Sequence, residues 1–568
     1  MRTAALQSTL RGMISQNHMK NIFDSLKPAF QGDLDMLEKT LETYSHDASL
    51  FEIKPRVVVY PKNAEDVKTL VKWANEHKQE DPTLSITARA AGTDMSGGAI
   101  GASIVMDCMR YMNKIIEVKP DYSIVQPGCF YRDLDKETKK INRFMPAYTA
   151  SREINAVGGM VGNNSGGEKA IKYGKVDEYI NSLKVVLSDG NEYEIKSLTK
   201  EEVQDKLNLT FGFEKDFYTK IFNLINDNYD EIVSAKPNVS KNSAGYYLWN
   251  VYNKTTGKFD LCQLIVGSQG TLGLVTEINF RLVPTHPYSN ILAVFLPSLD
   301  DVSKLVTEIL PFKPDSLETY DDKSMILAVR FFFDFFKQLG FWGAIKLGIQ
   351  FVPETLMILV GGIPKLVLMV EFTGESEDEI KRQLKEVQDK IKHFGFHTRI
   401  ARSMAEANKY WSIRHESFNL LRKHVKGKRT APFIDDIIVL PEHLPEFLPK
   451  IKALLDEYKL DYTVQGHLGN GNFHLIPLMD LDSPFSADTI LELSKKVYTL
   501  VHEYKGSITA EHNDGIIRTP FLTEQFGIKI VDLFKQTKNI FDPLNIFNPG
   551  KKVGGTFDDI KNAIRKKN

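Results

Sequence analysis

The sequence predicts an α+β protein built from two main domains. Short runs of β-branched and aromatic residues alternate with amphipathic helical stretches and with glycine-rich loops. The chain has 568 residues, 42% hydrophobic and 26% charged, a composition that supports large buried cores. We divide it into an N-terminal helical extension (1–50), a first α+β domain (51–285), a second domain (286–500) and a C-terminal segment (501–568).

The first domain opens with a predicted strand followed by a capped helix. Residues 57–60 are a β-branched run that ends at Pro61, and Asn63 is suited to cap a following helix. The apolar residues of that helix fall on one face. They are Val67, Leu70, Val71 and Ala74.

The second domain repeats a strand-then-helix order. The runs "AVFLP" (293–297) and "LVLMVEF" (366–372) are each followed by a helical pattern, so we expect neighbouring strands with helices on one side. Between them lies an apolar insert, about 325–365, in which no charge-free run reaches the roughly 18–20 residues that a spanning helix needs. Its aromatic face at 331–342 fits either a buried core helix or a surface that contacts a membrane.

Bulk composition excludes several classes of function. The net charge of −1 gives no reason to expect a nucleic-acid partner. Cys108, Cys129 and Cys262 lie far apart, which argues against a disulfide framework and against a cysteine-ligated metal cluster. The N-terminus lacks the pattern of a signal peptide. We expect a cytoplasmic protein, with peripheral contact at the inner face of the membrane as an option for the insert.

Three glycine-rich loops follow predicted strands. They are "RAAGTDMSGGA" (89–99), the stretch 145–180, and "VGSQGTLGLVTE" (266–277). Without a Cβ, such backbone can approach phosphate oxygens closely, although a plain turn also explains the first loop. No GxGxxG fingerprint is present, so a Rossmann dinucleotide site is not supported.

The stretch "GHLGNGNFHL" (466–475) predicts a β-hairpin with a four-residue loop. In that register Leu468 pairs with Phe473, and His467 pairs with His474 on one face, with Cβ atoms about 5 Å apart. Glu511 would complete a two-histidine, one-carboxylate metal site. From these residues alone, two histidines satisfied within a turn remain an equal alternative.

These segments, in this order, resemble the FAD-linked D-2-hydroxyacid dehydrogenase family of the vanillyl-alcohol oxidase superfamily, over about residues 50–555. The resemblance implies a two-part FAD-binding domain, an α+β cap domain with an antiparallel sheet, and a C-terminal segment that completes the active site. It assigns these residues to FAD: Arg89, Ala90, Ala91, Gly92, Thr93, Asp94, Ser96, Gly97, Gly98, Pro146, Ser151, Gly158, Gly159, Gly162, Asn163, Asn164, Gly166, Gly267, Gly270, Val275 and Asn548.

The resemblance also implies how the cofactors are held. No histidine lies between His77 and His286, so the usual histidyl link to flavin is not available and we expect noncovalent FAD. Cys129 is the remaining covalent candidate, and we favour a buried thiol. His467, His474 and Glu511 match the family's metal ligands, for Zn²⁺ first and for Mn²⁺ or Fe²⁺ as alternatives, and His512 matches its base.

For the substrate, Arg414 in "YWSIRHES" matches the arginine that holds the carboxylate, and Lys428 or Arg429 is a second candidate cation. Phe418 and Ile476 stand where hydroxyglutarate enzymes carry polar side chains, which favours a small or apolar acid.

The implied reaction is the oxidation of a D-2-hydroxy acid, D-lactate or similar, to the 2-oxo acid with hydride transfer to flavin N5. A quinone, a flavoprotein or an iron–sulfur protein would accept the electrons. The alternatives are glycolate or D-2-hydroxyglutarate as substrate, an enzyme of the alkyl-dihydroxyacetone-phosphate synthase type, and a non-enzymatic module with structural zinc.

Overall fold

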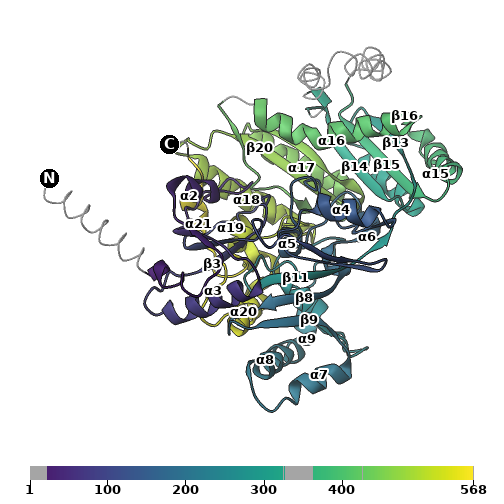
Figure 1. Ribbon diagram of the computed structural model, residues 1–568. Coiled ribbons are helices and arrows are strands. Elements are labelled where there is room, and N and C mark those ends of the chain that lie inside the picture. Colours follow the sequence, from purple (N-terminus) through teal and green to yellow (C-terminus); the bar gives the residue numbers. More distant parts are fainter. Residues whose placement is uncertain (1–21, 324, 327–362, 425–426, 567–568) are drawn as a thin grey trace, which may run out of the picture.

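The computed structural model describes residues 22–323, 325–326, 363–424 and 427–566 (Figure 1). The N-terminal part of the chain forms a four-stranded sheet of order β1-β2-β4-β3, in which β1 is antiparallel to β2 and the other neighbours are parallel. Phe547, from the C-terminal part, makes a single parallel bridge with Ile86 of this sheet. The strands of the sheet are β1 (Asp33–Asp35), β2 (Val57–Tyr60), β3 (Ile86–Arg89) and β4 (Ile104–Asp107). The described part of the N-terminal segment thus contributes a strand to this sheet, followed by α2 (Glu38–Tyr44).

The predicted strand and capped helix at the start of the first domain are confirmed. Helix α3 (Ala64–His77) follows β2, and the Asn63 side chain accepts a hydrogen bond from the backbone N–H of Asp66 at 3.1 Å. All four residues predicted for its apolar face are fully buried. They are Val67, Leu70, Val71 and Ala74.

A second, six-stranded antiparallel sheet stands beside the first, in the order β10-β9-β8-β11-β6-β5. Its strands are β5 (Ile115–Val118), β6 (Tyr122–Val125), β8 (Ile180–Val186), β9 (Glu192–Leu198), β10 (Phe259–Asp260) and β11 (Leu274–Arg281), with β7 (Arg143–Phe144) and β12 (Val283–Pro284) forming a separate short pair. The helices of this region are α4 (Tyr131–Lys139), α5 (Val157–Asn163), α6 (Ala170–Tyr173), α7 (Lys200–Leu207), α8 (Phe213–Asp227), α9 (Tyr229–Ser234), α10 (Leu248–Val251) and α11 (Cys262–Ile265).

The second domain is built on one antiparallel sheet, which we call the cap sheet, of order β16-β13-β15-β14-β19-β20-β17 with β18 beside β20. Its strands are β13 (Tyr288–Leu296), β14 (Ser316–Asp321), β15 (Leu366–Gly374), β16 (His397–Ile400), β17 (Arg429–Thr430), β18 (Ile437–Ile438), β19 (Asp461–His467) and β20 (Asn472–Met479). Strands β13 and β15 pair with Ile291 opposite Glu371, which confirms that the two predicted strands are neighbours.

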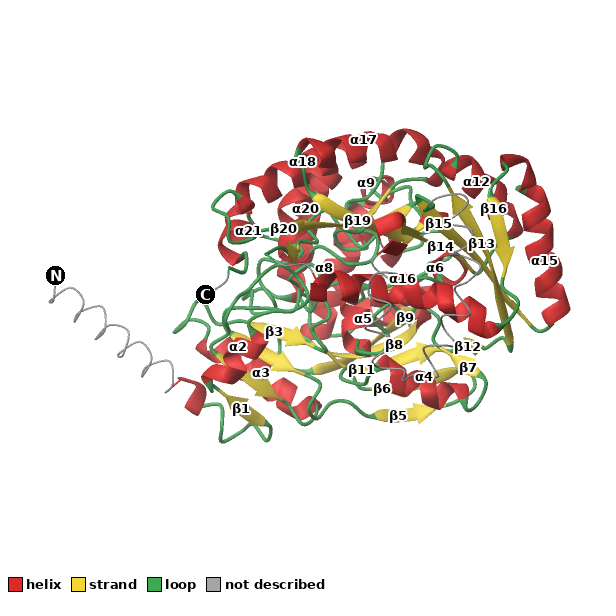
Figure 2. Cartoon of the chain, turned by 90° about the horizontal axis from the view of Figure 1, so that it is seen from above, coloured by secondary structure: helices red, strands yellow, loops and turns green. Residues whose placement is uncertain are grey.

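Helices cover both faces of the cap sheet, whereas the sequence predicted one. Helices α12 (Val302–Ile309), α15 (Glu377–Lys390), α17 (Leu444–Glu457) and α18 (Ser486–Glu503) lie on the outer side, and α16 (Met404–His424) lies on the side toward α5 (Figure 2). Strand β14 is buried on both faces for this reason. Its Leu317 joins the core under the outer helices, and Tyr320 packs with Tyr410 of α16. Glu318, two residues from Tyr320, therefore faces α16.

The C-terminal segment returns to the first domain through α19 (Gly515–Arg518), α20 (Leu522–Phe541), which contacts α8, and α21 (Phe557–Ala563). The apolar insert lies almost wholly outside the described residues, so the membrane-contact face expected at 331–342 stays a prediction. Within the part of the chain that the structure covers, none of the helices combines the length and the apolar character needed to cross a membrane.

Candidate active site

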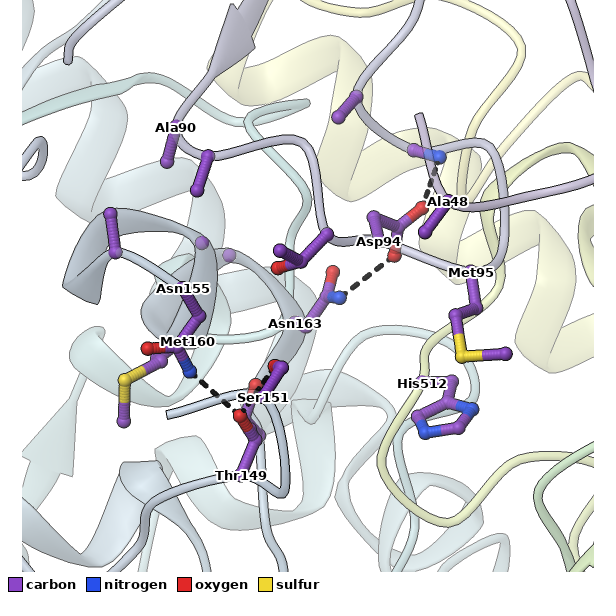
Figure 3. A pocket seen from close by; sticks show the side chains of 18 of the residues that line it. Ala48, Ala90, Asp94, Met95, Thr149, Ser151, Asn155, Met160, Asn163 and His512 are labelled. Atoms are coloured by element: carbon purple, nitrogen blue, oxygen red, sulfur yellow. Dashed lines mark hydrogen bonds between the residues drawn. The ribbon is translucent and has the colours of Figure 1, made fainter. Parts of the chain in front are cut away.

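A cavity of about 520 Å³ runs between the first domain and the cap sheet. The three glycine-rich loops line part of it, and residues of α16, the β19–β20 hairpin and the 511–512 loop line the rest. In Figure 3, the loop that carries Asp94 and Met95 lies between Ala90 and His512. The cavity therefore joins the predicted cofactor loops to the predicted catalytic residues.

Most of the residues assigned to FAD line this cavity. They are Arg89, Ala90, Ala91, Gly92, Thr93, Asp94, Gly98, Ser151, Gly158, Gly159, Gly162, Asn163, Gly166, Gly270 and Val275. The others are not among its lining residues, and they are Ser96, Gly97, Pro146, Asn164, Gly267 and Asn548. One of these residues, Asn548, connects the loops to each other. Its amide donates hydrogen bonds to the carbonyls of Gly98 and Gln269, at 2.8 Å each, and so links the first glycine-rich loop to the third.

Side chains hold the loops in place and leave their backbone facing the cavity. Asp94 accepts hydrogen bonds from the backbone N–H of Gly98 at 2.6 Å and from the Asn163 amide at 2.8 Å, the second of which is drawn in Figure 3. A Cβ added at Gly159 or Gly162 would meet only one neighbour at ordinary van der Waals distance, Ala90 Cβ at 3.6 Å or Gln269 Cα at 3.9 Å, and both glycines line the cavity. Exposed backbone of this kind fits a ligand as extended as FAD.

The histidine hairpin is confirmed, but its register differs from the prediction. His467 lies opposite Asn472, and His474 lies opposite Gln465. The loop takes a 3₁₀ turn at 468–470 and then Gly471 at φ +73°, so the whole pairing is shifted by two residues. A shift of two keeps each side chain on its face, and the two imidazoles meet as a diagonal pair with ring centroids 5.2 Å apart.

Both imidazoles direct Nε2 toward one carboxylate oxygen. Oε1 of Glu511 lies 3.0 Å from Nε2 of His467 and 3.5 Å from Nε2 of His474. Each Nδ1 contacts a different carboxylate: Glu318 at 2.6 Å from His467, and Asp435 at 3.1 Å from His474. A carboxylate on the far nitrogen of each ring is the arrangement that orients metal-ligating histidines, so these three side chains could hold a cation.

A second possible group in the same place is Asp436, His474, Glu511 and His512, whose ligand atoms lie within 4.8 Å of one another. Asp436 is poorly available, because its Oδ2 already accepts from the backbone N–H groups of Glu511 at 2.8 Å and His512 at 2.7 Å and from the Thr509 hydroxyl at 2.6 Å. This group shares His474 and Glu511 with the predicted set, and the assignment of His467 as the third ligand stays a prediction.

Burial and neighbouring charges set the electrostatics of the cluster. Burial alone would lower the pKa of His474, but Asp435 outweighs it and raises that pKa to about 10. Burial would raise the pKa of Glu511, yet Lys241, at 3.0 Å from its Oε2, and the imidazoles hold it well below the usual value. Burial likewise opposes ionisation of His512, and Asp436 and Asp435 raise its pKa despite that.

The structure places Arg414 in the cavity and Arg429 outside it. Arg414, from α16, donates to Gln465 at 2.9 Å and lies 3.3 Å from the Glu318 carboxylate. Arg429 pairs instead with Asp482 at 3.0 Å and is not a lining residue, because β17 is at the edge of the cap sheet, so we withdraw it from the substrate site. Lys428, the alternative cation, pairs with Asp461 at 2.7 Å, also away from the lining.

Of the two residues that pointed to a small acid, Ile476 lines the cavity. The side chain of Phe418 lies outside the described part of the chain. The thiol of Cys129 is buried, its pKa is raised to about 12 by that burial, and it is not among the lining residues. Arg518, whose role the sequence left open, donates to the carbonyls of Ile508, Asn513 and Asp435 and so holds the loops together.

Sequence reasoning missed the residues that support the histidines. Asp435 and Asp436 carried a usable signal, since two adjacent acids interrupt the apolar run "APFIDDIIVLPEH". No sequence pattern marks Glu318 or Lys241, because each lies in an ordinary strand or loop and reaches the site only through folding.

Two family models match the chain. "FAD binding domain" matches residues 55–196, and "FAD linked oxidases, C-terminal domain" matches residues 285–552. Together with the fold they define a flavoprotein with a two-part FAD-binding domain. The chain belongs to the FAD-linked D-2-hydroxyacid dehydrogenase family, as its motifs indicated.

Curated relatives carry several substrate names. D-2-hydroxyglutarate dehydrogenase of Escherichia coli (strain K12) is 26% identical, over 92% of this chain and 50% of that protein. The glycolate oxidase subunit GlcD of Bacillus subtilis (strain 168) is 24% identical, over 89% and 91%. D-lactate dehydrogenase of Archaeoglobus fulgidus is 26% identical, over 92% and 99%. The chain spans about half the length of the first hydroxyglutarate dehydrogenases that it matches.

Solved structures share the fold. The 4-ethylphenol oxidase from Gulosibacter chungangensis superimposes with a TM-score of 0.67 over 95% of this chain and 97% of that one. An alkyldihydroxyacetonephosphate synthase does so with a TM-score of 0.64, over 93% and 84%. Both are 16% identical to this chain, so the likeness is one of architecture, and it confirms the predicted FAD-binding fold.

Proposed function

We propose that the protein oxidises a small D-2-hydroxy acid to the 2-oxo acid, with noncovalent FAD as the immediate acceptor. One observation carries this proposal: a single cavity joins the glycine-rich backbone to a cluster that holds an arginine, three histidines and Glu511. The same cavity can therefore present a hydroxy acid to a flavin. The relatives named for D-lactate, glycolate and D-2-hydroxyglutarate support the class of substrate.

FAD would lie along the loops at 89–98, 158–166 and 270, and it supplies the acceptor for the hydride that leaves C2 of the acid. The glycine backbone of these loops lines the cavity and can approach phosphate oxygens closely. Cys129 lies outside the cavity lining, and burial raises the pKa of Cys108, which does line it, so neither thiol is suited to form the thiolate that a covalent link needs.

Arg414 binds the substrate carboxylate in this proposal. Its guanidinium is held by Gln465 and Glu318, so its plane is fixed before the substrate arrives, and a planar fork matches a carboxylate in two parallel hydrogen bonds. Ile476 offers only an apolar contact to the rest of the substrate. This favours D-lactate or a similar short acid over D-2-hydroxyglutarate, whose second carboxylate would need a polar partner.

His512 takes the proton of the C2 hydroxyl. Its Nδ1 lies 2.7 Å from the Asp435 carboxylate, which leaves Nε2 as the atom that can accept a proton. A divalent metal, Zn²⁺ or alternatively Mn²⁺ or Fe²⁺, would be held by His467, His474 and Glu511 and would make that hydroxyl more acidic. The electrons then pass to a separate acceptor, a quinone, a flavoprotein or an iron–sulfur protein.

Anaerobic reduction of the bound flavin tests the proposal. The purified protein is mixed without oxygen with D- and L-lactate, glycolate and D-2-hydroxyglutarate, and loss of the flavin absorbance is followed in time. We expect D-lactate to bleach the flavin fastest and L-lactate to leave it oxidised. Bleaching by dithionite but by none of the acids would refute the proposed reaction, and faster reduction by D-2-hydroxyglutarate would refute the preference for a short acid.

A further inference from the structure

One buried carboxylate faces two of the three site histidines. Asp435, fully buried just before β18, has Oδ1 at 3.1 Å from Nδ1 of His474 and Oδ2 at 2.7 Å from Nδ1 of His512. The two rings stack with centroids 5.0 Å apart and planes 18° apart. The contact between Oδ2 of Asp435 and Nδ1 of His512 is an ion pair without hydrogen-bond geometry, and among the described residues neither of these two buried atoms has a hydrogen-bond partner.

When either ring is neutral, the Asp435 carboxylate beside its Nδ1 favours one of the two tautomers. An ionised carboxylate only accepts hydrogen bonds, so a neutral imidazole beside it carries its proton on Nδ1 and its lone pair on Nε2. For His474 the lone pair then points to the side of Glu511, where a cation would be held. For His512 the lone pair is the one that can receive a proton from the substrate. A single carboxylate thus prepares both rings for different tasks.

We propose that Asp435 is the positioning residue of this active site, shared by a metal-ligating histidine and the histidine base. The inference rests on the proposed function and deepens it, since it names the group that gives His474 and His512 their separate roles.

The surroundings of Asp435 support this role. The guanidinium of Arg518 donates to the Asp435 carbonyl at 2.6 Å and fixes its main chain. The next residue, Asp436, has a left-handed φ of +68° and accepts from the backbone N–H groups of Glu511 and His512. The Asp436 side chain thus binds the backbone at 511–512, while the Asp435 side chain contacts the imidazole rings of His474 and His512.

Asp435→Asn is the sharpest test, because it preserves shape and removes the second acceptor. An amide can accept from one Nδ1–H but must donate to the other ring, which would force that ring into the opposite tautomer. We expect the single-turnover rate of flavin reduction by D-lactate to fall by about 10²–10⁴-fold, as for loss of a positioned base, with the apparent Kd for the acid unchanged. Zn²⁺ affinity, measured by competition with a coloured chelator, should fall by about 10–100-fold.

Two further variants keep the test decisive. Asp435→Glu retains a carboxylate and should recover part of both losses. Asp66→Asn is the matched control. Asp66, in α3 of the first domain, is also buried and accepts hydrogen bonds from the backbone N–H groups of Gln31 and Lys62, so its replacement should change neither quantity. If the asparagine variant does not fold, as judged by its Tm and by flavin retention, the glutamate variant decides by the same two measurements.

The outcomes separate this inference from the proposed function. A wild type that no acid reduces refutes the proposed function, and the Zn²⁺ competition still tests Asp435. An active wild type with a folded Asp435→Asn variant of equal rate and equal Zn²⁺ affinity overturns the inference. Equal losses in Asp435→Glu and Asp435→Asn, accompanied by a comparable fall in Tm, would assign Asp435 to stability alone and would also overturn it.

Discussion

Replacing Arg414 by lysine should remove one charge-assisted hydrogen bond to the substrate carboxylate. In the structure the guanidinium uses one arm toward Gln465 at 2.9 Å and the other toward Glu318 at 3.3 Å, which sets its plane. A lysine ammonium is a point charge without that fork. Losing one hydrogen bond to a charged group costs about 1.5–3 kcal/mol, which corresponds to a fall of roughly 10- to 150-fold in kcat/KM.

The assay is anaerobic stopped-flow reduction of the flavin over a range of D-lactate concentrations. Thermal unfolding and the flavin spectrum show whether Arg414→Lys keeps its fold and cofactor. Arg429→Lys is the comparison, because Arg429 pairs with Asp482 outside the cavity lining, and we expect it to behave as wild type. Wild-type kinetics in Arg414→Lys, or an equal loss in both variants, would refute this account of carboxylate recognition.

Three further predictions address the rest of the site. His474→Ala should lose metal and activity together, whereas His512→Asn should keep metal and FAD and lose about 10²–10⁴-fold in rate; metal analysis beside single-turnover kinetics checks this, and the opposite pattern would exchange the two roles. Acid precipitation should release intact FAD into the supernatant, because the Cys129 thiol is buried away from the cavity; colour that stays with the pellet would contradict a noncovalent flavin. Burial would raise the pKa of Glu168, but its 2.8 Å contact with His415 and nearby cations hold that pKa below the usual 4.5. This carboxylate therefore adds stability above pH 4.5 that is lost as the pH falls further, so Glu168→Gln should lower Tm at neutral pH and flatten its decline in acid; an identical pH dependence of Tm would show that the contact adds no stability.

Local pattern was enough to predict the elements and the faces that they present. Contacts between residues a few positions apart form these elements, so the sequence shows them directly. Examples are strand 57–60, the cap at Asn63 and the apolar face of α3. The glycine-rich loops and the histidine hairpin were predictable for the same reason. An error of two residues in the hairpin register left both imidazoles on the predicted face, because side chains in a strand alternate with a period of two.

Tertiary structure alone decided which groups surround those histidines. Glu318 reaches His467 across 149 residues of chain, and Lys241 reaches Glu511 across 270. No local pattern marks such partners, since their positions depend on how β14 docks beside β19 and how the first domain packs on the cap sheet. The same long-range packing turned Arg414 into the cavity, placed Arg429 at an edge of the sheet, and brought Asp435 against two imidazoles. The sequence by itself determined the chemical groups and their local geometry, whereas the protonation and orientation of those groups depend on charges that only folding brings into contact with them.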